Sequence, residues 1–308
     1  MALRFGLLGS GHWATETHAP ALAAAPDAVL AGVWGRNPDR AEALAREHGV
    51  RAYRDVDELL ADVDAVAISL PPEVQQPLAL RAAAAGRHLL LEKPVGLSAA
   101  DAAAVAREAS AAGVASVVFF TYRFVPAVER ILEDAAAKGG WDGGRADVLA
   151  SIFEPGSPYA SSEWRRTRGA LWDLGPHILS VFLPVLGEVT EVTAMSGPHS
   201  TSHALLRHES GAVSTMTLSL DAPPAANGAR LGFVGDDGVL TVPVGEILAV
   251  NALTRAIGRL AQSASGSRPD PCDATFAAKV NAVLEATQRS MDQGATVAVT
   301  PPDLFPAQ

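Results

Sequence analysis

The stretch Arg4-Phe-Gly-Leu-Leu-Gly-Ser-Gly-His-Trp-Ala-Thr-Glu-Thr-His-Ala-Pro20 decides the fold of the amino-terminal part of this chain. An apolar run ends at Gly9, and after a thin turn the chain continues with helical composition. Gly9 ends the expected strand, Gly11 lets the backbone approach a ligand closely, and Ala14 lets the new helix pack on the sheet. Free N–H groups at the start of such a helix suit a pyrophosphate, so the pattern G-x-G-x-x-A predicts a dinucleotide-binding turn.

The first 120 residues alternate apolar runs with alanine-rich helical stretches. Most of the runs lack polar alternation, which is typical of strands buried on both faces. This order predicts an α/β fold with a doubly wound parallel sheet, the Rossmann arrangement. The expected strands are 3–8, 28–34, 63–70, 88–91 and 114–120, and the expected helices are 39–47, 73–85 and 99–112, the last with Ser98 as its N-cap and Gly113 at its end.

After about residue 122 the pattern changes to that of an open, mainly antiparallel sheet. The segments 203–209 and 212–220 form one expected hairpin, and a second is expected around Asp236-Asp237-Gly238. Residues 263–271 have the composition of a loop, and a last helix is expected over 273–293 with Asp273 as its cap. The sequence thus predicts a dinucleotide-binding domain over 1–121 and an α+β domain for substrate binding and oligomerisation over 122–308.

Composition excludes several classes of protein. The 308 residues include 24 basic and 34 acidic side chains, and a net charge of −10 disfavours nucleic acid as a partner. Cys272 is the only cysteine, which excludes an internal disulfide and a thiolate metal cluster and fits a reducing compartment. No signal sequence or long uninterrupted apolar stretch is apparent. We therefore expect a soluble cytoplasmic protein with neither a membrane nor a metal site.

The end of the second expected strand bears on the choice of cofactor. A site selective for NAD usually holds the adenosine ribose through an Asp or Glu at this point, and neither stands at positions 34 to 37. Arg36, with Asn37 and Arg40, instead offers hydrogen-bond donors to a 2′-phosphate. The sequence therefore favours NADP, with NAD as the alternative. The other interpretation of Arg36 is a solvated arginine in a polar turn.

Lys93 is the first candidate for chemistry, in the stretch His88-Leu-Leu-Leu-Glu92-Lys93-Pro94. It follows a buried strand and faces the crevice where doubly wound folds bind ligands. An ammonium in such a position hydrogen-bonds a substrate oxygen and favours its alkoxide. The alternative is a strand-end lysine that pairs with Glu92 and reaches into solvent.

Asp173 and His177 are the second candidate, in the stretch Trp172-Asp173-Leu174-Gly175-Pro176-His177. If a helix begins near Trp172, the two side chains share one face. Pro176 is tolerated in a first turn, which supports this placement. Histidine acts as a general acid or base near neutral pH, and the aspartate orients it or the substrate. The alternative makes Asp173 an N-cap and His177 a histidine of the core.

Three patterns, G-S-G-H-W-A, E-K-P and D-L-G-P-H, follow one another in the chain before the open-sheet domain and the late helix. In this order they resemble the Gfo/Idh/MocA oxidoreductases over essentially the whole chain. The segment Tyr122-Arg123-Phe124-Val125-Pro126 is similar to the family's R-[FY]-x-P segment, which opens the second domain. The resemblance implies a final helix that packs back on the nucleotide domain.

The resemblance also implies a role for each candidate residue. Lys93 contacts the reacting hydroxyl and the nicotinamide ribose, His177 exchanges the hydroxyl proton, and Asp173 is its partner or binds a substrate hydroxyl. From the residues and the resemblance together, the candidate cofactor-binding residues are Gly9, Ser10, Gly11, His12, Trp13, Arg36, Asn37, Leu70, Pro71, Pro72, Gln75, Glu92 and Lys93. The candidate substrate-binding residues are Lys93, Tyr122, Arg123, Trp164, Arg165, Asp173 and His177.

The chain departs from the family pattern at Gln75, where relatives commonly have a histidine, and this puts one cofactor contact in doubt. Arg165 and Arg166 lie in an expected substrate loop, where they either bind a polar or anionic group or remain solvated. Trp164 and Trp172 form either a sugar-facing wall or part of the core.

The activity implied is hydride transfer between nicotinamide and a secondary alcohol or ketone of a sugar, cyclitol or similar polyol. Two alternatives stay open: an NAD-dependent enzyme that cleaves glycosidic bonds through transient redox chemistry, and a dinucleotide-sensing regulator without activity. Relatives often pair through the open sheet, so we expect a homodimer or homotetramer formed through the carboxy-terminal domain. No residue set in the sequence selects one substrate.

Overall fold

The chain forms two compact units in the structure, a computed structural model that describes residues 2–245, 248–266 and 268–304. The first unit consists of Met1–Phe124, Leu248–Ala278 and Pro302–Gln308, and the second of Val125–Ile247 and Lys279–Pro301. These units differ from the continuous ranges 1–121 and 122–308 expected from the sequence, because two late segments lie within the first unit.

A six-stranded parallel sheet forms the centre of the first unit, with the order β3-β2-β1-β4-β5-β6. This order is that of the Rossmann fold, so the predicted doubly wound sheet is confirmed. All but β3 correspond to expected strands, and β4 and β6 are shorter than expected. The strands are β1 (Leu3–Leu8), β2 (Ala28–Trp34), β3 (Arg51–Tyr53), β4 (Ala65–Ile68), β5 (His88–Leu91) and β6 (Ser116–Val118).

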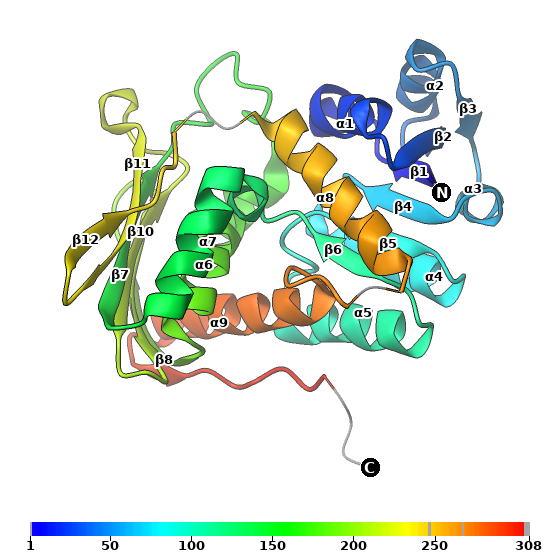
Figure 1. The fold of residues 1–308 in the computed structure, drawn as a ribbon. Helices are drawn as coiled ribbons and strands as arrows, with labels where there is room; N and C mark the ends of the chain where they lie inside the picture. The colour runs from blue at the N-terminus through cyan, green and yellow to red at the C-terminus, as the bar shows by residue number, and fades with distance from the viewer. Residues whose placement is uncertain (1, 246–247, 267, 305–308) are drawn as a thin grey trace. The chain divides into compact units, whose positions relative to one another are not determined.

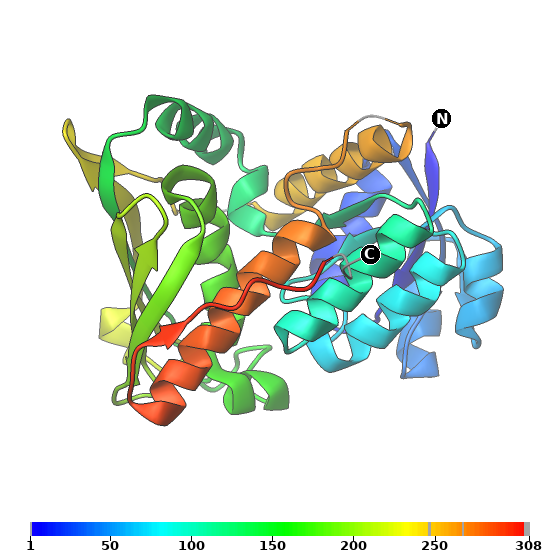
Figure 2. The ribbon, with the colours of Figure 1, turned by 90° about the horizontal axis from the view of Figure 1, so that it is seen from below.

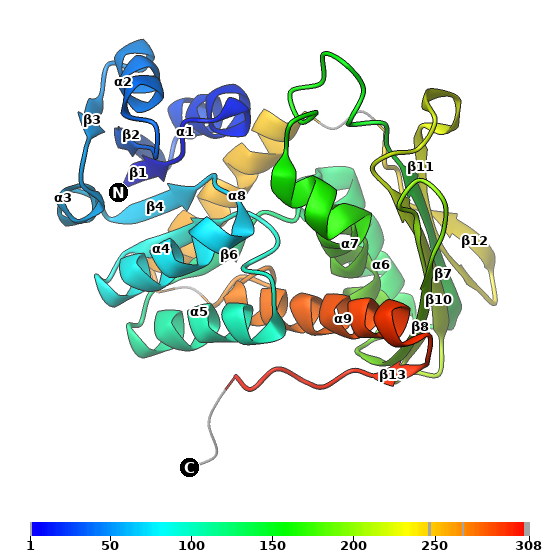
Figure 3. The same ribbon diagram turned by 180° about the vertical axis from the view of Figure 1, so that it is seen from behind.

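Helices cover both faces of this sheet, as Figures 1 and 3 show for α8 on one face and α4 on the other. The chain-order helices are α1 (Ala19–Ala24), α2 (Pro38–Glu47), α3 (Val56–Ala61), α4 (Pro72–Ala84) and α5 (Ala99–Ala111). The late helix α8 (Ala249–Ala264) packs against α1, β5 and β6. Ser98 caps α5 as predicted, because its hydroxyl accepts a hydrogen bond from the backbone N–H of Asp101 at 3.0 Å.

A seven-stranded mixed sheet forms the second unit, with the order β12-β11-β7-β10-β9-β8-β13. Both predicted hairpins are present: β9 pairs antiparallel with β10, and β11 with β12. The pair of β7 and β10 is parallel. The strands are β7 (Trp141–Leu149), β8 (Val189–Ser196), β9 (Ser202–His208), β10 (Val213–Ser219), β11 (Gly228–Gly235), β12 (Gly238–Thr241) and β13 (Val297–Ala298).

Helices lie along one face of this second sheet (Figures 1 and 3). They are α6 (Pro126–Lys138), α7 (Glu163–Leu186) and the part of α9 (Ala274–Gln293) that follows Ala278. Figure 2 shows the chain turning back after α9 into the edge strand β13. Asp273 caps α9 as predicted, since its carboxylate accepts a hydrogen bond from the backbone N–H of Phe276 at 2.8 Å.

The helix α7 is the one helix of the described residues that is long and apolar enough to cross a membrane by length and composition. It contains Pro176 and Pro184, and 72% of its most apolar window is buried inside the protein. Such burial is typical of the core helix of a globular domain.

Cys272, just before α9, is fully buried in the first unit. Burial raises the pKa of its thiol to about 11. The thiol is therefore protonated near neutral pH, the form that is the poorer nucleophile.

Candidate active site

The carboxyl ends of the parallel strands bring the predicted cofactor-binding residues of the first unit to one edge of its sheet. In a parallel sheet these ends face the same crevice, which is where doubly wound folds bind ligands. The turn 9–13 follows β1, Arg36 and Asn37 follow β2, Leu70 to Pro72 follow β4, Glu92 and Lys93 follow β5, and Tyr122 and Arg123 follow β6.

The two glycines of the turn have different physical roles. Gly9 has φ +145°, and a Cβ there would lie 2.4 Å from the backbone oxygen of Ser69, so close contact between β1 and the end of β4 requires glycine. Gly11 is exposed, and a Cβ there would meet nothing within 4 Å. The open space beside the Gly11 backbone fits a cofactor pyrophosphate.

The helix that follows the turn begins with a π-helical segment, Ala14–His18. Its i→i+5 hydrogen-bond pattern places residues five apart about one turn apart. Trp13 and His18 therefore reach the same carboxylate oxygen of Glu92, the indole Nε1–H at 2.6 Å and the His18 Nε2 at 2.9 Å. His18 is fully buried, and the Glu92 side chain is 12% exposed. Glu92 thus holds the start of this helix against the end of β5.

Gln75 fastens the same strand end from the other side. Its amide N–H₂ donates to the backbone oxygens of Glu92 at 2.7 Å and of Pro94 at 3.2 Å, and its amide oxygen accepts from the Glu92 N–H at 2.7 Å. The side chain is fully buried. Gln75 therefore positions the backbone on both sides of Lys93, with its amide nitrogen and its amide oxygen both bonded to that backbone.

A cavity of about 320 Å³ adjoins the turn. Arg40 on α2 lines it together with the turn itself, whereas Arg36 is not among the lining residues, and both arginines are exposed. The carboxamide oxygen of Asn37 accepts a hydrogen bond from the Arg40 N–H at 3.0 Å, so Asn37 caps α2. The lining residues are Ser10, Gly11, His12, Thr15, Arg40, Ala43, Leu44 and Glu47.

Tyr122 and Arg123 lie in a short 3₁₀ helix, Thr121–Phe124. Burial raises the pKa of the Tyr122 hydroxyl, so it remains protonated. The Arg123 guanidinium lies 5.7 Å from the centre of the Phe276 ring. The backbone oxygen of Arg123 accepts a hydrogen bond from the Arg259 guanidinium at 3.4 Å.

Asp173 and His177 lie in the second unit, on α7. The helix is kinked at Gly169, which has φ +69°, so a new helical segment starts at Ala170. Asp173 and His177 are one turn apart on this segment, as predicted. Asp173 lies beyond the first positions of the segment and is not its N-cap. The expectation that Pro176 stands in a first turn was wrong, since Pro176 is in the second turn and leaves the Trp172 carbonyl without its intrahelical donor.

Arg165 is not a solvated loop arginine. Its Nε donates to Oδ2 of Asp173 at 2.9 Å, and its guanidinium carbon lies 4.5 Å from the Tyr159 ring centre and 4.7 Å from that of Trp164. Trp172 is 2% exposed and belongs to the core. No pattern in the sequence indicated that Arg165 and Asp173 pair, because eight residues separate them.

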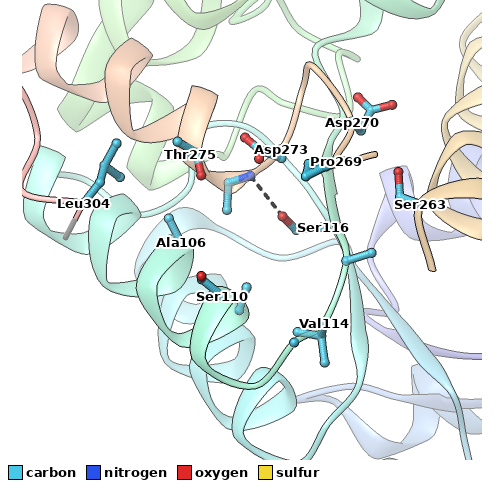
Figure 4. Close-up of a pocket in the computed structure, with 14 residues that line it drawn as sticks. Ala106, Ser110, Val114, Ser116, Ser263, Pro269, Asp270, Asp273, Thr275 and Leu304 are labelled. Carbon is cyan, nitrogen blue, oxygen red and sulfur yellow. Dashed lines mark hydrogen bonds between the residues drawn. The ribbon is translucent and has the colours of Figure 1, made fainter. Parts of the chain in front are cut away.

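A further cavity, of about 360 Å³, lies at the amino end of β6, away from the carboxyl edge (Figure 4). Several of its polar groups already have partners. Ser116 accepts a hydrogen bond from the Ala274 N–H at 3.0 Å, and Asp270 accepts two from Arg259 at 2.6 Å each. Burial raises the pKa of Asp273, whose carboxylate caps α9.

The described part of the chain contains no cluster of side chains suited to bind a metal ion. Among the residues of 2–245, 248–266 and 268–304, no group of three or more His, Cys, Asp or Glu side chains is placed to hold an ion.

The parallel sheet and its open glycine turn define a protein of the dinucleotide-binding class. The family description "Oxidoreductase family, NAD-binding Rossmann fold" matches residues 3–120, and that of the GFO/IDH/MocA C-terminal domain matches residues 144–241. D-xylose 1-dehydrogenase (NADP(+)) 2 of Haloferax volcanii is 31% identical over 234 residues, which cover 72% of this chain and 70% of that protein. The chain therefore belongs to the Gfo/Idh/MocA family of oxidoreductases, as the sequence resemblance predicted.

Two further similarities agree with this assignment. Inositol 2-dehydrogenase of Rhizobium meliloti is 33% identical over 192 residues, which cover 61% of this chain and 56% of that protein. The crystal structure of GenD2 from gentamicin A biosynthesis, in complex with NAD, has a TM-score of 0.85 at 25% identity and covers 97% of each chain.

Replacement of Gln75 tests how the β5 end is held. We expect Gln75→Ala to lower the free energy of unfolding by roughly 2–4 kcal/mol, because the buried polar groups of Glu92 and Pro94 lose their partner. Denaturant unfolding measures the loss. Gln76→Ala, a half-buried neighbour on α4, is the matched control with a small expected effect. Equal losses in the two variants would contradict this role of Gln75.

Proposed function

We propose that this protein is an NAD(P)-dependent dehydrogenase or reductase that acts on a secondary alcohol or ketone of a sugar, cyclitol or similar polyol. The observation that carries the proposal is the carboxyl edge of the parallel sheet, where an open Gly11 backbone follows β1 and Lys93 follows β5, with only β4 between these two strands. Within the second unit, an aspartate and a histidine share one helix face. Together these residue types suit reversible hydride transfer coupled to proton transfer.

The open backbone at Gly11 and the adjoining cavity fit a nicotinamide dinucleotide, held by the turn 9–13 and by Arg40. The bound cofactor supplies the site that accepts or donates hydride. We assign Lys93 to the substrate oxygen, where its ammonium stabilises developing negative charge. His177 takes the hydroxyl proton during oxidation and returns it during reduction. Asp173 accepts a hydrogen bond from the substrate or orients the imidazole.

Of the functions considered from the sequence, the dehydrogenase is best supported. The relatives compared above bear the names of a xylose and an inositol dehydrogenase. Lys93, Asp173 and His177 are all present, whereas a regulator without activity has no need of all three. A glycoside-cleaving enzyme would release a free sugar without a net change in nicotinamide, which absorbance and sugar analysis distinguish from the proposed reaction.

The turnover of variants at the two proposed catalytic residues tests this mechanism. We expect Lys93→Ala and His177→Ala each to lower kcat by roughly 100-fold or more, a loss typical of acid–base and electrostatic groups. A screen of polyols and ketoses by nicotinamide absorbance measures kcat. Calorimetry should show an almost unchanged Kd for the cofactor.

The matched control for the lysine variant is Lys138→Ala, because Lys138 is an exposed lysine that pairs with Asp237. This control should retain normal turnover. If Lys93→Ala or His177→Ala also turns over normally, that residue has no part in the mechanism. Co-purified NAD that does not exchange, together with release of free sugar, would favour the glycoside-cleaving alternative.

We propose that NADP is the preferred cofactor and that arginines after β2 bind its 2′-phosphate. Arg40 lines the cavity beside the turn, and Arg36 is exposed at the end of β2. A guanidinium recognises phosphate through charge-assisted hydrogen bonds. The sequence pattern favours Arg36 as the main phosphate-binding residue, whereas the cavity lining makes Arg40 the stronger candidate for that role.

Calorimetric titration with NADPH and NADH tests the cofactor preference. We expect Arg40→Ala to raise the Kd for NADPH by about 10-fold or more and that for NADH by much less, because one charged hydrogen bond is lost only with the phosphate. Arg36→Ala should change NADPH binding less. Arg46→Ala, at an exposed position of α2, is the control. Equal losses for both cofactors in Arg40→Ala would exclude Arg40 as a phosphate-binding residue.

We also propose a cytoplasmic homodimer or homotetramer that pairs through the open sheet of the second unit. Met195, Leu205 and Val213 are exposed by 65, 51 and 40%, and the strand register places them on one face. Exposed apolar side chains on one sheet face are typical of an association surface.

Light scattering at micromolar concentration tests the oligomer. We expect the wild-type protein to be larger than a monomer, and Leu205→Asp to shift it to a monomer because a carboxylate is costly to bury. Glu209→Asp, at an exposed turn, serves as the control. A monomeric wild-type protein would refute the proposal.

A further inference from the structure

Arg165 and Asp173 form a partly buried ion pair that bridges the kink of α7. Their side chains are 21% and 9% exposed, and Nε of Arg165 lies 2.9 Å from Oδ2 of Asp173. In a straight α-helix, residues eight apart are separated by about 12 Å along the axis, whereas side-chain pairs form at spacings of three or four. The pair therefore depends on the break at Gly169. Arg165 lies in the helical segment before this break, and Asp173 lies in the segment after it.

The Arg165 guanidinium is itself held in place by its neighbours. The rings of Tyr159 and Trp164 lie against it, with 4.5 and 4.7 Å between the guanidinium carbon and the ring centres. Nη1 also donates to the hydroxyl of Ser162 at 3.4 Å. Stacking on aromatic rings restricts the guanidinium plane, so its Nε–H is directed at Asp173 before any substrate binds.

We propose that Arg165 is a positioning residue for the reaction proposed above, because it fixes the carboxylate of Asp173. The inference rests on the proposed function, in which Asp173 and His177 act on the substrate hydroxyl. A carboxylate that is held by a charged hydrogen bond stays in one orientation. Arg165 thus fixes where Asp173 presents its acceptor, one helical turn from His177. Small displacements of such groups lower rates strongly, by up to about 100-fold for 1 Å.

The neighbouring arginine provides a matched control. Arg166 lies over Phe153, with 4.2 Å between the guanidinium carbon and the ring centre, and donates two hydrogen bonds to the backbone oxygen of Ala160 at 2.7 and 3.1 Å. It fastens the same loop before α7. No contact between Arg166 and Asp173 is present among the described residues. A variant at 166 therefore reports on loop anchoring alone.

The experiment compares Arg165→Ala, Arg165→Lys and Arg166→Ala with wild type in steady-state kinetics with the best polyol from the screen. We expect Arg165→Ala to lower kcat about 10-fold or more while the Kd for NADPH, measured by calorimetry, stays within about twofold. Arg165→Lys should recover part of kcat, because an ammonium also donates to Asp173. Arg166→Ala should keep kcat within about twofold of wild type.

A double-variant cycle shows whether Arg165 acts through Asp173. If it does, Arg165→Ala combined with Asp173→Ala should have the same kcat as Asp173→Ala alone, because Arg165 has no effect on kcat once Asp173 is removed. Multiplicative losses would overturn the positioning role. An Arg165→Ala variant that loses activity only on anionic polyols, with neutral ones unaffected, would also overturn it and make Arg165 a direct substrate contact.

The outcomes separate this inference from the function on which it rests. Wild-type protein that binds NADPH but converts no polyol or ketose overturns the proposed function, and the positioning role with it. Wild-type turnover with an unchanged kcat in Arg165→Ala overturns the positioning role alone. Equal kcat losses in Arg165→Ala and Arg166→Ala would show that loop anchoring, and not Asp173, explains the effect.

Discussion

The nucleotide-binding unit depends on how the buried strand β5 ends. A strand in the middle of a parallel sheet leaves backbone polar groups at its carboxyl end that must find partners away from water. Gln75 supplies these partners for Glu92 and Pro94, and the Glu92 carboxylate receives Trp13 and His18. The same contacts fix Lys93 between Glu92 and Pro94. They also connect the helix that follows the glycine turn to the end of β5.

The second unit meets a similar demand through a break in a helix. A straight α7 would carry Arg165 and Asp173 about 12 Å apart along its axis, whereas the kink at Gly169 lets the two charges pair. The cost of burying the Asp173 side chain, which is 9% exposed, is offset by this charged hydrogen bond. One glycine with a positive φ therefore determines the environment of a proposed active-site carboxylate.

Much of the fold and part of the candidate site could be predicted from the sequence. Apolar runs of strand length and G-x-G-x-x-A are local signals, so the parallel sheet and both hairpins of the second unit were foreseen. The short strand β3 was missed because three residues carry no periodicity. Gln75 was considered near the cofactor because relatives of the resembled family commonly have a histidine there, and its burial goes with hydrogen bonds to the backbone of Glu92, 17 residues later in the chain.

The sequence by itself determined the class of the protein, because turn glycines, strand composition and the order of three short patterns are properties of local chain segments. The tertiary structure alone decided the partners of the chemical groups. The π-helical start that turns Trp13 and His18 toward one oxygen, the Arg40 lining of the cavity and the pairing of Arg165 with Asp173 join residues at spacings that no local pattern encodes. Such contacts arise when buried charges and backbone groups must be satisfied by whatever the fold brings near.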